Sequence, residues 1–148
     1  MAYEKLTYGG SEEKSYLYFA FRADTFDTEA ISTELGIQPT SVMIKKDPVP
    51  KSTAWKFKIM ADFAYDLETP LQNLVGVFES KIEAINLLKQ RLNLETQLVF
   101  VIYIDIDPEV STPYFPMDKR VIDFLHKTQT TVDFDIYKAD TIGLLEKL

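Results

Sequence analysis

The residues of this sequence that are best suited to chemistry are five lysines close to its single tryptophan, Trp55. An aromatic ring beside ammonium groups can hold a planar anion or an acidic protein segment, and Arg22 would join such a site if its strand were a neighbour. However, strand alternation sets Trp55 and Lys56 on opposite sides, so a second interpretation places Trp55 in the core and the lysines in solvent. Both interpretations stay open. The lysines are Lys45, Lys46, Lys51, Lys56 and Lys58.

Acidic residues form a second group of candidates. Asp105, Asp107 and Glu109 recur at every other position, so in a continuing strand their carboxylates would face the same way and could share a hard cation. We favour the alternative, a strand end protected by charge, because no glycine-containing calcium loop follows. Asp24 and Asp27 form another carboxylate pair, but Asp27 has the position of a helix cap. We therefore predict no metal site and no cofactor.

The side chains of several common catalytic sites are missing. The chain has a single histidine, His126, and no cysteine, which leaves no Cys-His pair and no multi-histidine metal site. Its five glycines form neither a GxGxxG nor a GxxxxGK pattern, so no phosphate-binding loop is indicated. The sequence predicts no catalytic residue and favours a protein without enzymatic activity.

Length and composition are typical of one globular domain. Of the 148 residues, 46% are hydrophobic and 26% are charged, which is enough for a core that needs neither disulfides nor metal. The formal net charge of -7 argues against general nucleic-acid binding. No apolar run reaches the roughly 18 residues that a membrane span requires. The lack of cysteine agrees with the reducing cytoplasm, where we expect the protein; its oligomeric state is left open.

Strand and helix signals alternate along the chain, most clearly between residues 16 and 40. Aromatic residues over 16–23 predict a central strand covered on part of both faces. A helix over 28–35 follows, with Asp27 as its cap and Gly36 as its stop. Periodicity further predicts strands over 41–46, 53–60, 96–107 and 131–138, and helices over 70–92, 118–127 and 140–147.

Two of these helices carry more detailed predictions. The long helix has Thr69 as its N-cap and Pro70 at its first position, and Gly76 marks the expected bend. In the helix over 118–127, the residues predicted to face the core are Val121, Ile122 and Leu125.

The order β-α-β-β-α-β predicts an α+β, ferredoxin-like (split βαβ) sandwich, to which the C-terminal part adds an extra α-β unit. We expect a single domain over residues 1–148. Residues 1–15 are predicted to form a flexible arm, residues 16–138 the core and residues 139–148 a short C-terminal helix.

The strands over 41–46 and 53–60 are predicted to pair as a hairpin, and one further pattern runs from the strand over 16–23 into the second strand of this hairpin. It consists of Tyr18-Phe19, Phe21, Asp24, Phe26-Asp27, Ile31, Leu35-Gly36-Ile37 and Pro39-Thr40, followed by a lysine-rich turn and Trp55. This pattern resembles the DUF4279 family of small bacterial proteins of unknown function. The resemblance covers residues 16–137 and implies the same fold, but it implies no activity and assigns no role to any residue.

Two functional hypotheses follow. The first is a non-enzymatic interaction module, an antidote-like or regulatory binder that presents a charged sheet or helix face to a protein partner. The second is a small-molecule binding domain or an undiscovered enzyme, with an anionic-ligand pocket near Trp55 that sets Lys45 and Arg22 against the acids at Asp105. The candidate ligand or partner surface comprises Arg22, Asp24, Lys45, Lys46, Trp55 and Asp105.

Overall fold

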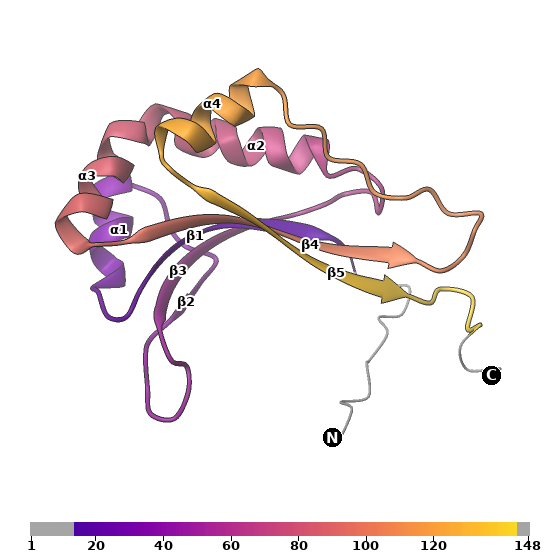
Figure 1. The fold of residues 1–148 in the computed structure, drawn as a ribbon, viewed down its shortest axis with the longest axis horizontal. Coiled ribbons are helices and arrows are strands. Elements are labelled where there is room, and N and C mark those ends of the chain that lie inside the picture. The colour runs from indigo at the N-terminus through magenta and orange to yellow at the C-terminus, as the bar shows by residue number, and fades with distance from the viewer. Residues whose placement is uncertain (1–13, 145–148) are drawn as a thin grey trace.

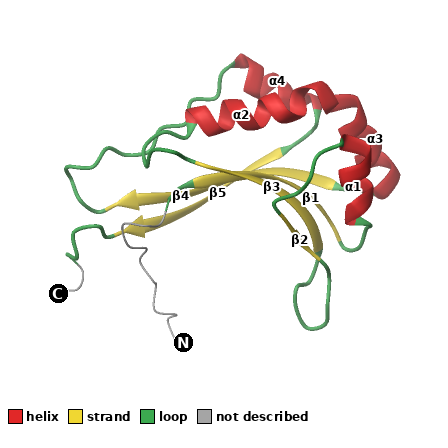
Figure 2. Ribbon diagram, turned by 180° about the vertical axis from the view of Figure 1, so that it is seen from behind, coloured by secondary structure: helices red, strands yellow, loops and turns green. Residues whose placement is uncertain are grey.

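In the computed structural model, which describes residues 14–144, helices cover one face of a five-stranded sheet (Figures 1 and 2). The predicted α+β class is therefore confirmed. The strands are β1 (Tyr16–Ala23), β2 (Ser41–Met43), β3 (Thr53–Met60), β4 (Glu95–Asp105) and β5 (Thr131–Ala139). The helices are α1 (Thr28–Leu35), α2 (Glu68–Phe78), the 3-10 turn η1 (Glu79–Lys81), α3 (Ile82–Leu92) and α4 (Lys119–Lys127).

The sheet has the strand order β2-β3-β1-β4-β5. β1 lies in the centre and pairs antiparallel with both β3 and β4, and β2 pairs antiparallel with β3, which confirms the predicted hairpin. β5 is parallel to β4, as a crossover through a helix requires. Within residues 14–144, no helix has the length and apolar character needed to cross a membrane.

The first strand and helix follow the local sequence signals. Asp27 accepts a hydrogen bond from the N–H of Glu29 at 3.0 Å, and Gly36 ends α1 with φ 66° while its own N–H donates to the carbonyl of Ser32. Glycine takes this left-handed conformation without the steric penalty that a Cβ would add. The predicted strand over 16–23 and helix over 28–35 are both confirmed.

The hydrophobic core lies between the helices and the sheet and is built around aromatic rings. The ring of Phe78 lies 4.8 Å from that of Phe19 and 5.4 Å from that of Phe57, centre to centre. Trp55 is fully buried in this core, and its Nε1–H donates to the hydroxyl of Ser32 at 3.0 Å. Its one polar atom is therefore satisfied, as a buried indole requires.

The predicted long helix is broken rather than bent. Gly76 lies inside α2, and the break follows Phe78, where η1 separates α2 from α3. The carboxylate of Glu79 is bound there by two guanidinium N–H groups of Arg120 from α4, each at 2.8 Å. The predicted N-cap is also wrong, because the side chain of Asp66 accepts hydrogen bonds from the N–H and the hydroxyl of Thr69.

Two other predictions from periodicity are corrected. β2 ends at Met43 rather than at residue 46, because the N–H of Lys46 donates to the carbonyl of Pro50 and closes a loop instead of continuing the ladder. In α4 the position predicted for Ile122 is wrong, since its side chain is 54% exposed while Phe124 takes the inward position.

The predictions for the chain ends are tested only in part. Residues 1–13 of the expected arm and residues 145–147 of the expected last helix lie outside the described residues. Residues 140–144 form bends and a turn, not the predicted helix. Ser15, assigned to the arm, is buried, and its hydroxyl accepts from the N–H of Tyr103, so the ordered domain begins before β1.

Candidate binding surface

The sheet face opposite the helices (Figures 1 and 2), which we call the open face, carries polar and aromatic side chains. In β1 the side chains of Leu17, Phe19 and Phe21 are fully buried under the helices. Tyr16 and Tyr18 alternate with them and are only half-buried. No helix of residues 14–144 crosses the other face, but Ala20 on that face is buried, so the prediction that β1 is covered on part of both faces is confirmed.

The registers of neighbouring strands arrange the open face in rows across the sheet, because directly opposed residues share a face. Basic side chains stand on β3 and β1 in these rows, and the acidic side chains stand on β4 and β5. The open face is thus divided into a cationic and an anionic side. The rows are Met60-Tyr16-Val101-Asp135, Lys58-Tyr18-Val99-Asp133, Lys56-Ala20-Gln97-Thr131 and Ala54-Arg22-Glu95.

Lysine ammonium groups lie over tyrosine rings on the cationic side. The Nζ of Lys56 is 4.9 Å from the centre of the Tyr18 ring, and the Nζ of Lys58 is 4.9 Å from that of Tyr16. The two rings stack with 6.4 Å between their centres. Such contacts are worth about 0.5–1 kcal/mol at exposed sites. They orient the lysines and leave their charge available to a ligand or partner.

Burial and neighbouring charges shift two pKa values on the open face. The pKa of Tyr16 is raised, first by burial and then by nearby groups including Tyr18, so its hydroxyl stays protonated and can donate a hydrogen bond. The pKa of Lys56 is lowered, first by burial and then by the positive charge of Arg22. A bound anion would offset that repulsion, so this part of the surface favours a negatively charged partner.

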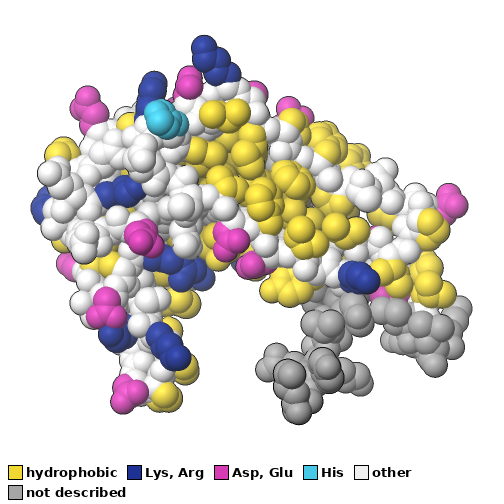
Figure 3. Space-filling model, viewed as in Figure 1, with side chains coloured by type: hydrophobic (Ala, Val, Ile, Leu, Met, Phe, Trp, Pro, Cys, Tyr) yellow, Lys and Arg dark blue, Asp and Glu magenta, His cyan; other side chains and the backbone are white. Residues whose placement is uncertain are grey.

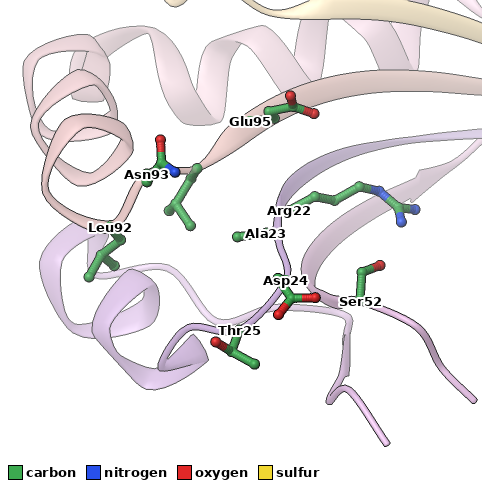
Figure 4. A pocket seen from close by; sticks show the side chains of 9 residues that line it. Arg22, Ala23, Asp24, Thr25, Ser52, Leu92, Asn93 and Glu95 are labelled. Atoms are coloured by element: carbon green, nitrogen blue, oxygen red, sulfur yellow. The ribbon is translucent and has the colours of Figure 1, made fainter. Parts of the chain in front are cut away.

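Arg22 is the least satisfied of these cations. Its Nε atom is buried and has no hydrogen-bond partner among residues 14–144. Glu95 lies directly opposite in the strand register, but Figure 4 shows the Arg22 guanidinium extending away from it. A buried N–H without an acceptor costs about 1–3 kcal/mol. Arg22 is therefore the clearest position at which an added acceptor would stabilise the protein.

A cavity of about 520 Å³ lies where β1 ends, and it is lined by Arg22, Asp24, Thr25 and Ser52 and by the turn over residues 92–95 (Figure 4). Asp24 forms an ion pair with Lys45 across its rim, with 71% and 41% of the two side chains exposed. An ion pair this exposed adds little stability. Both charges remain accessible to solvent.

The structure brings together four of the six predicted site residues. Arg22, Asp24 and Lys45 meet at the exit of β1, and Lys46 lines an adjoining cavity with Lys45. Trp55 is corrected to a core residue, because no part of its side chain reaches the surface.

Asp105 is corrected as well, because it lies at the far end of β4 from this group. Ten residues separate it from Glu95, which is about 33 Å of extended strand. The expected pocket that combined Trp55, Lys45, Arg22 and Asp105 is therefore not formed.

The acids after β4 support the turn that follows the strand. The side chain of Asp105 accepts from the N–H of Asp107, and the side chain of Asp107 accepts from the N–H of Glu109, at 2.9 and 3.0 Å. Burial acts to raise the pKa of Asp105, but hydrogen bonds from Thr141 and Asp107 outweigh it and lower that pKa. Across residues 14–144 no group of three or more histidines and acids is arranged to hold a metal ion.

Sequence reasoning missed the tyrosines of the open face. Tyr16, Tyr18, Tyr103 and Tyr137 lie on it, and the last two stack with 5.3 Å between ring centres. Their alternation with purely apolar residues in each strand was the available signal. Tyrosine has a polar tip, so this alternation indicates a wet face more directly than a core face.

The fold and this surface define a small α+β domain with one helix-covered and one open, charged and aromatic sheet face. The chain belongs to the DUF4279 family, a domain of unknown function, whose family model matches residues 13–139. The resemblance inferred from the sequence is confirmed. Searches of the curated proteins and of the solved structures each found no match.

Proposed function

We propose that this protein is a non-enzymatic interaction module, an antidote-like or regulatory binder, and that it holds a protein partner on its open face. The observation that carries the proposal is the placement of Tyr16, Tyr18 and Met60, flanked by lysines, on the sheet face that no helix of the described residues covers. Tyrosine, methionine and arginine are enriched at the centres of protein interfaces. Half-buried rings in fixed positions lose little entropy on binding.

The cationic side of the open face indicates the chemistry of the partner. Among the ion pairs of residues 14–144, none involves Arg22, Lys56 or Lys58. An acidic segment of a partner would neutralise these charges and supply the acceptor that Arg22 lacks. We therefore expect binding that weakens as salt is added.

A photo-cross-linking amino acid tests the location of this surface. Benzoylphenylalanine at position 18 lies on the open face, and at position 83, an exposed site on α3, it serves as the matched control. We expect position 18 to capture a partner in the host cell and position 83 to capture none. The identified partner should then bind the purified protein less tightly after Lys58→Glu. Equal capture from both positions, or none from position 18, would refute the proposal.

We further propose that the fold is ferredoxin-like with one added α-β unit and that the protein acts in the bacterial cytoplasm. The strand order β4-β1-β3-β2 with antiparallel neighbours supports the first statement, since this is the arrangement of a split βαβ sandwich. The lack of cysteine supports the second. A fractionation of the host that found the protein outside the cytoplasm would contradict it.

A second candidate function is the binding of a small anion beside Arg22. The buried, unpartnered Nε and the lowered pKa of Lys56 favour it. Citrate and inorganic phosphate are suitable probes in a thermal-shift titration. We expect them to raise the Tm of the wild type and of Lys45→Ala but not that of Arg22→Met, which keeps the side-chain stem. If the wild type and Arg22→Met respond alike, there is no anion site at this position.

A further inference from the structure

β5 is an exposed edge strand that carries apolar side chains on its helix-side face and acids on its open face. Within residues 14–144 it pairs only with β4, and residues 133–138 are all exposed. Phe134 is 41% and Ile136 is 60% exposed. Figure 3 shows apolar side chains gathered in a band over the side of the molecule where β5 lies. The other edge of the sheet, β2, has only three residues; a short edge strand resists pairing, whereas a long apolar one invites it.

The hydrogen-bonding groups on the free edge of β5 can be assigned from two contacts. The carbonyl of Ala139 accepts from the N–H of Ile106, which follows β4, so odd-numbered residues of β5 turn their backbone groups toward β4. Because these groups alternate along a strand, even-numbered residues turn theirs to the free edge. The N–H of Phe134 is consistent with this assignment, since it donates to the side chain of Asp133 and not to a carbonyl of β4. Ile136 and Lys138 therefore direct a backbone donor and acceptor outward.

We propose that β5 pairs antiparallel with β5 of a second copy of this chain, about a two-fold axis at Ile136, so that the two sheets become one. Because the backbone N–H and C=O of the axis residue both point to the free edge, that residue can donate one hydrogen bond to its counterpart in the second copy and accept one from it. Ile136 then packs against its counterpart, and Phe134 of each copy lies on the same apolar face. The surface lies apart from the proposed partner surface at Tyr16 and Tyr18, so each copy keeps its open face.

The charges of β5 disfavour two of the neighbouring registers. An axis at Phe134 would set Asp133 opposite Asp135 of the second copy, and an axis at Asp135 would set that residue opposite itself. Like charges in directly opposed positions destabilise a strand pair. With the axis at Ile136, Asp135 lies opposite Tyr137 of the second copy and Phe134 lies opposite Lys138, so no acids oppose each other.

Single cysteines test both the pairing and its register, because the chain has none of its own. Directly opposed residues that exchange hydrogen bonds have Cα atoms about 5.5 Å apart, within the range for a disulfide. Under mild oxidation we expect Ile136→Cys to give a covalent dimer, and Phe134→Cys and Lys138→Cys to cross-link when mixed but not alone. Ile122→Cys on α4 is equally exposed and serves as the control. Cross-linking of Ile136→Cys no faster than the control, or of Phe134→Cys alone, would overturn the proposal.

Sedimentation equilibrium gives an independent readout. We expect the wild type to be dimeric at high micromolar concentration and Ile136→Lys to be monomeric, because two lysines would then meet at the axis. Ile122→Lys should remain dimeric. A monomeric wild type, or equal association of both variants, would also overturn the proposal. Partner capture from position 18 does not depend on whether the protein forms this dimer. Failure of the dimer proposal can therefore be told apart from failure of the proposed function.

Discussion

Replacing Ser32 by alanine removes the hydroxyl that accepts the Nε1–H of Trp55. Ser32 is 5% exposed and Trp55 is 0% exposed, and the bond is 3.0 Å long. A buried donor left without an acceptor costs about 1–3 kcal/mol. For a domain of this length, about 2 kcal/mol lowers the Tm by roughly 4–8 °C. We expect Ser32→Ala to destabilise the protein by that amount, with little change in the denaturant m-value.

Denaturant unfolding followed by the fluorescence of the single tryptophan measures the loss in Ser32→Ala, and circular dichroism measures it in variants that lack Trp55. A double-mutant cycle with Trp55→Phe separates the hydrogen bond from the packing, because phenylalanine has no N–H to leave unsatisfied. Ser32→Ala should cost much less in that background. An equal cost in both backgrounds, or a cost below about 0.5 kcal/mol in the wild type, would refute the argument that the bond keeps Trp55 in the core.

Three further predictions concern the ends of helices and the sheet edge. Hydrogen bonds from Arg120 lower the pKa of Glu79, so the stability that this contact adds is present above the unfolded-state pKa and is lost as pH falls through the lowered folded-state pKa. Arg120 also donates to Gln72, a contact that does not titrate, so the Tm of Arg120→Met should lie below that of the wild type at pH 7 and the gap should narrow in strong acid; a constant gap would contradict the assignment. Gly36→Ala should cost about 1 kcal/mol, since φ is 66° with open space around the site, whereas Gly76→Ala inside α2 should add up to about 1 kcal/mol. Denaturant unfolding measures both changes in stability, and a change of the same sign for Gly36→Ala and Gly76→Ala would contradict this prediction. Asp133→Ala should tighten the proposed dimer by about tenfold in sedimentation, because it frees one outward N–H in each copy; unchanged association would show that this acid does not protect the edge.

Several elements could be predicted from local chemistry alone. The strand over 16–23, the cap at Asp27 and the stop at Gly36 depend on neighbours within a few residues, and all three are present. The break after Phe78 was not predictable in this way. Periodicity continues through it, and the contact that accompanies it joins Glu79 to Arg120, 41 positions later in the chain.

The candidate surface shows the same division. The sequence supplied the side chains that could bind an anion or a partner, and it predicted that Arg22 and Asp24 stand where β1 ends. Alternation left two places for Trp55, core and surface, and only the packing of α1 against β3 decided for the core. The tertiary structure likewise separated Asp105 from Lys45 and brought Lys58 into one row with Tyr18.

The sequence by itself determined the class of fold, the first strand-helix unit and the charges available for binding. Only the tertiary structure decided that the helices of residues 14–144 lie on one face, that Tyr16 and Tyr18 stand on the other, and that β5 forms the edge of the described sheet. The reason is physical. Caps and turns depend on bonds between neighbouring residues, whereas strand order and register depend on contacts between segments far apart, whose free energies no local pattern contains.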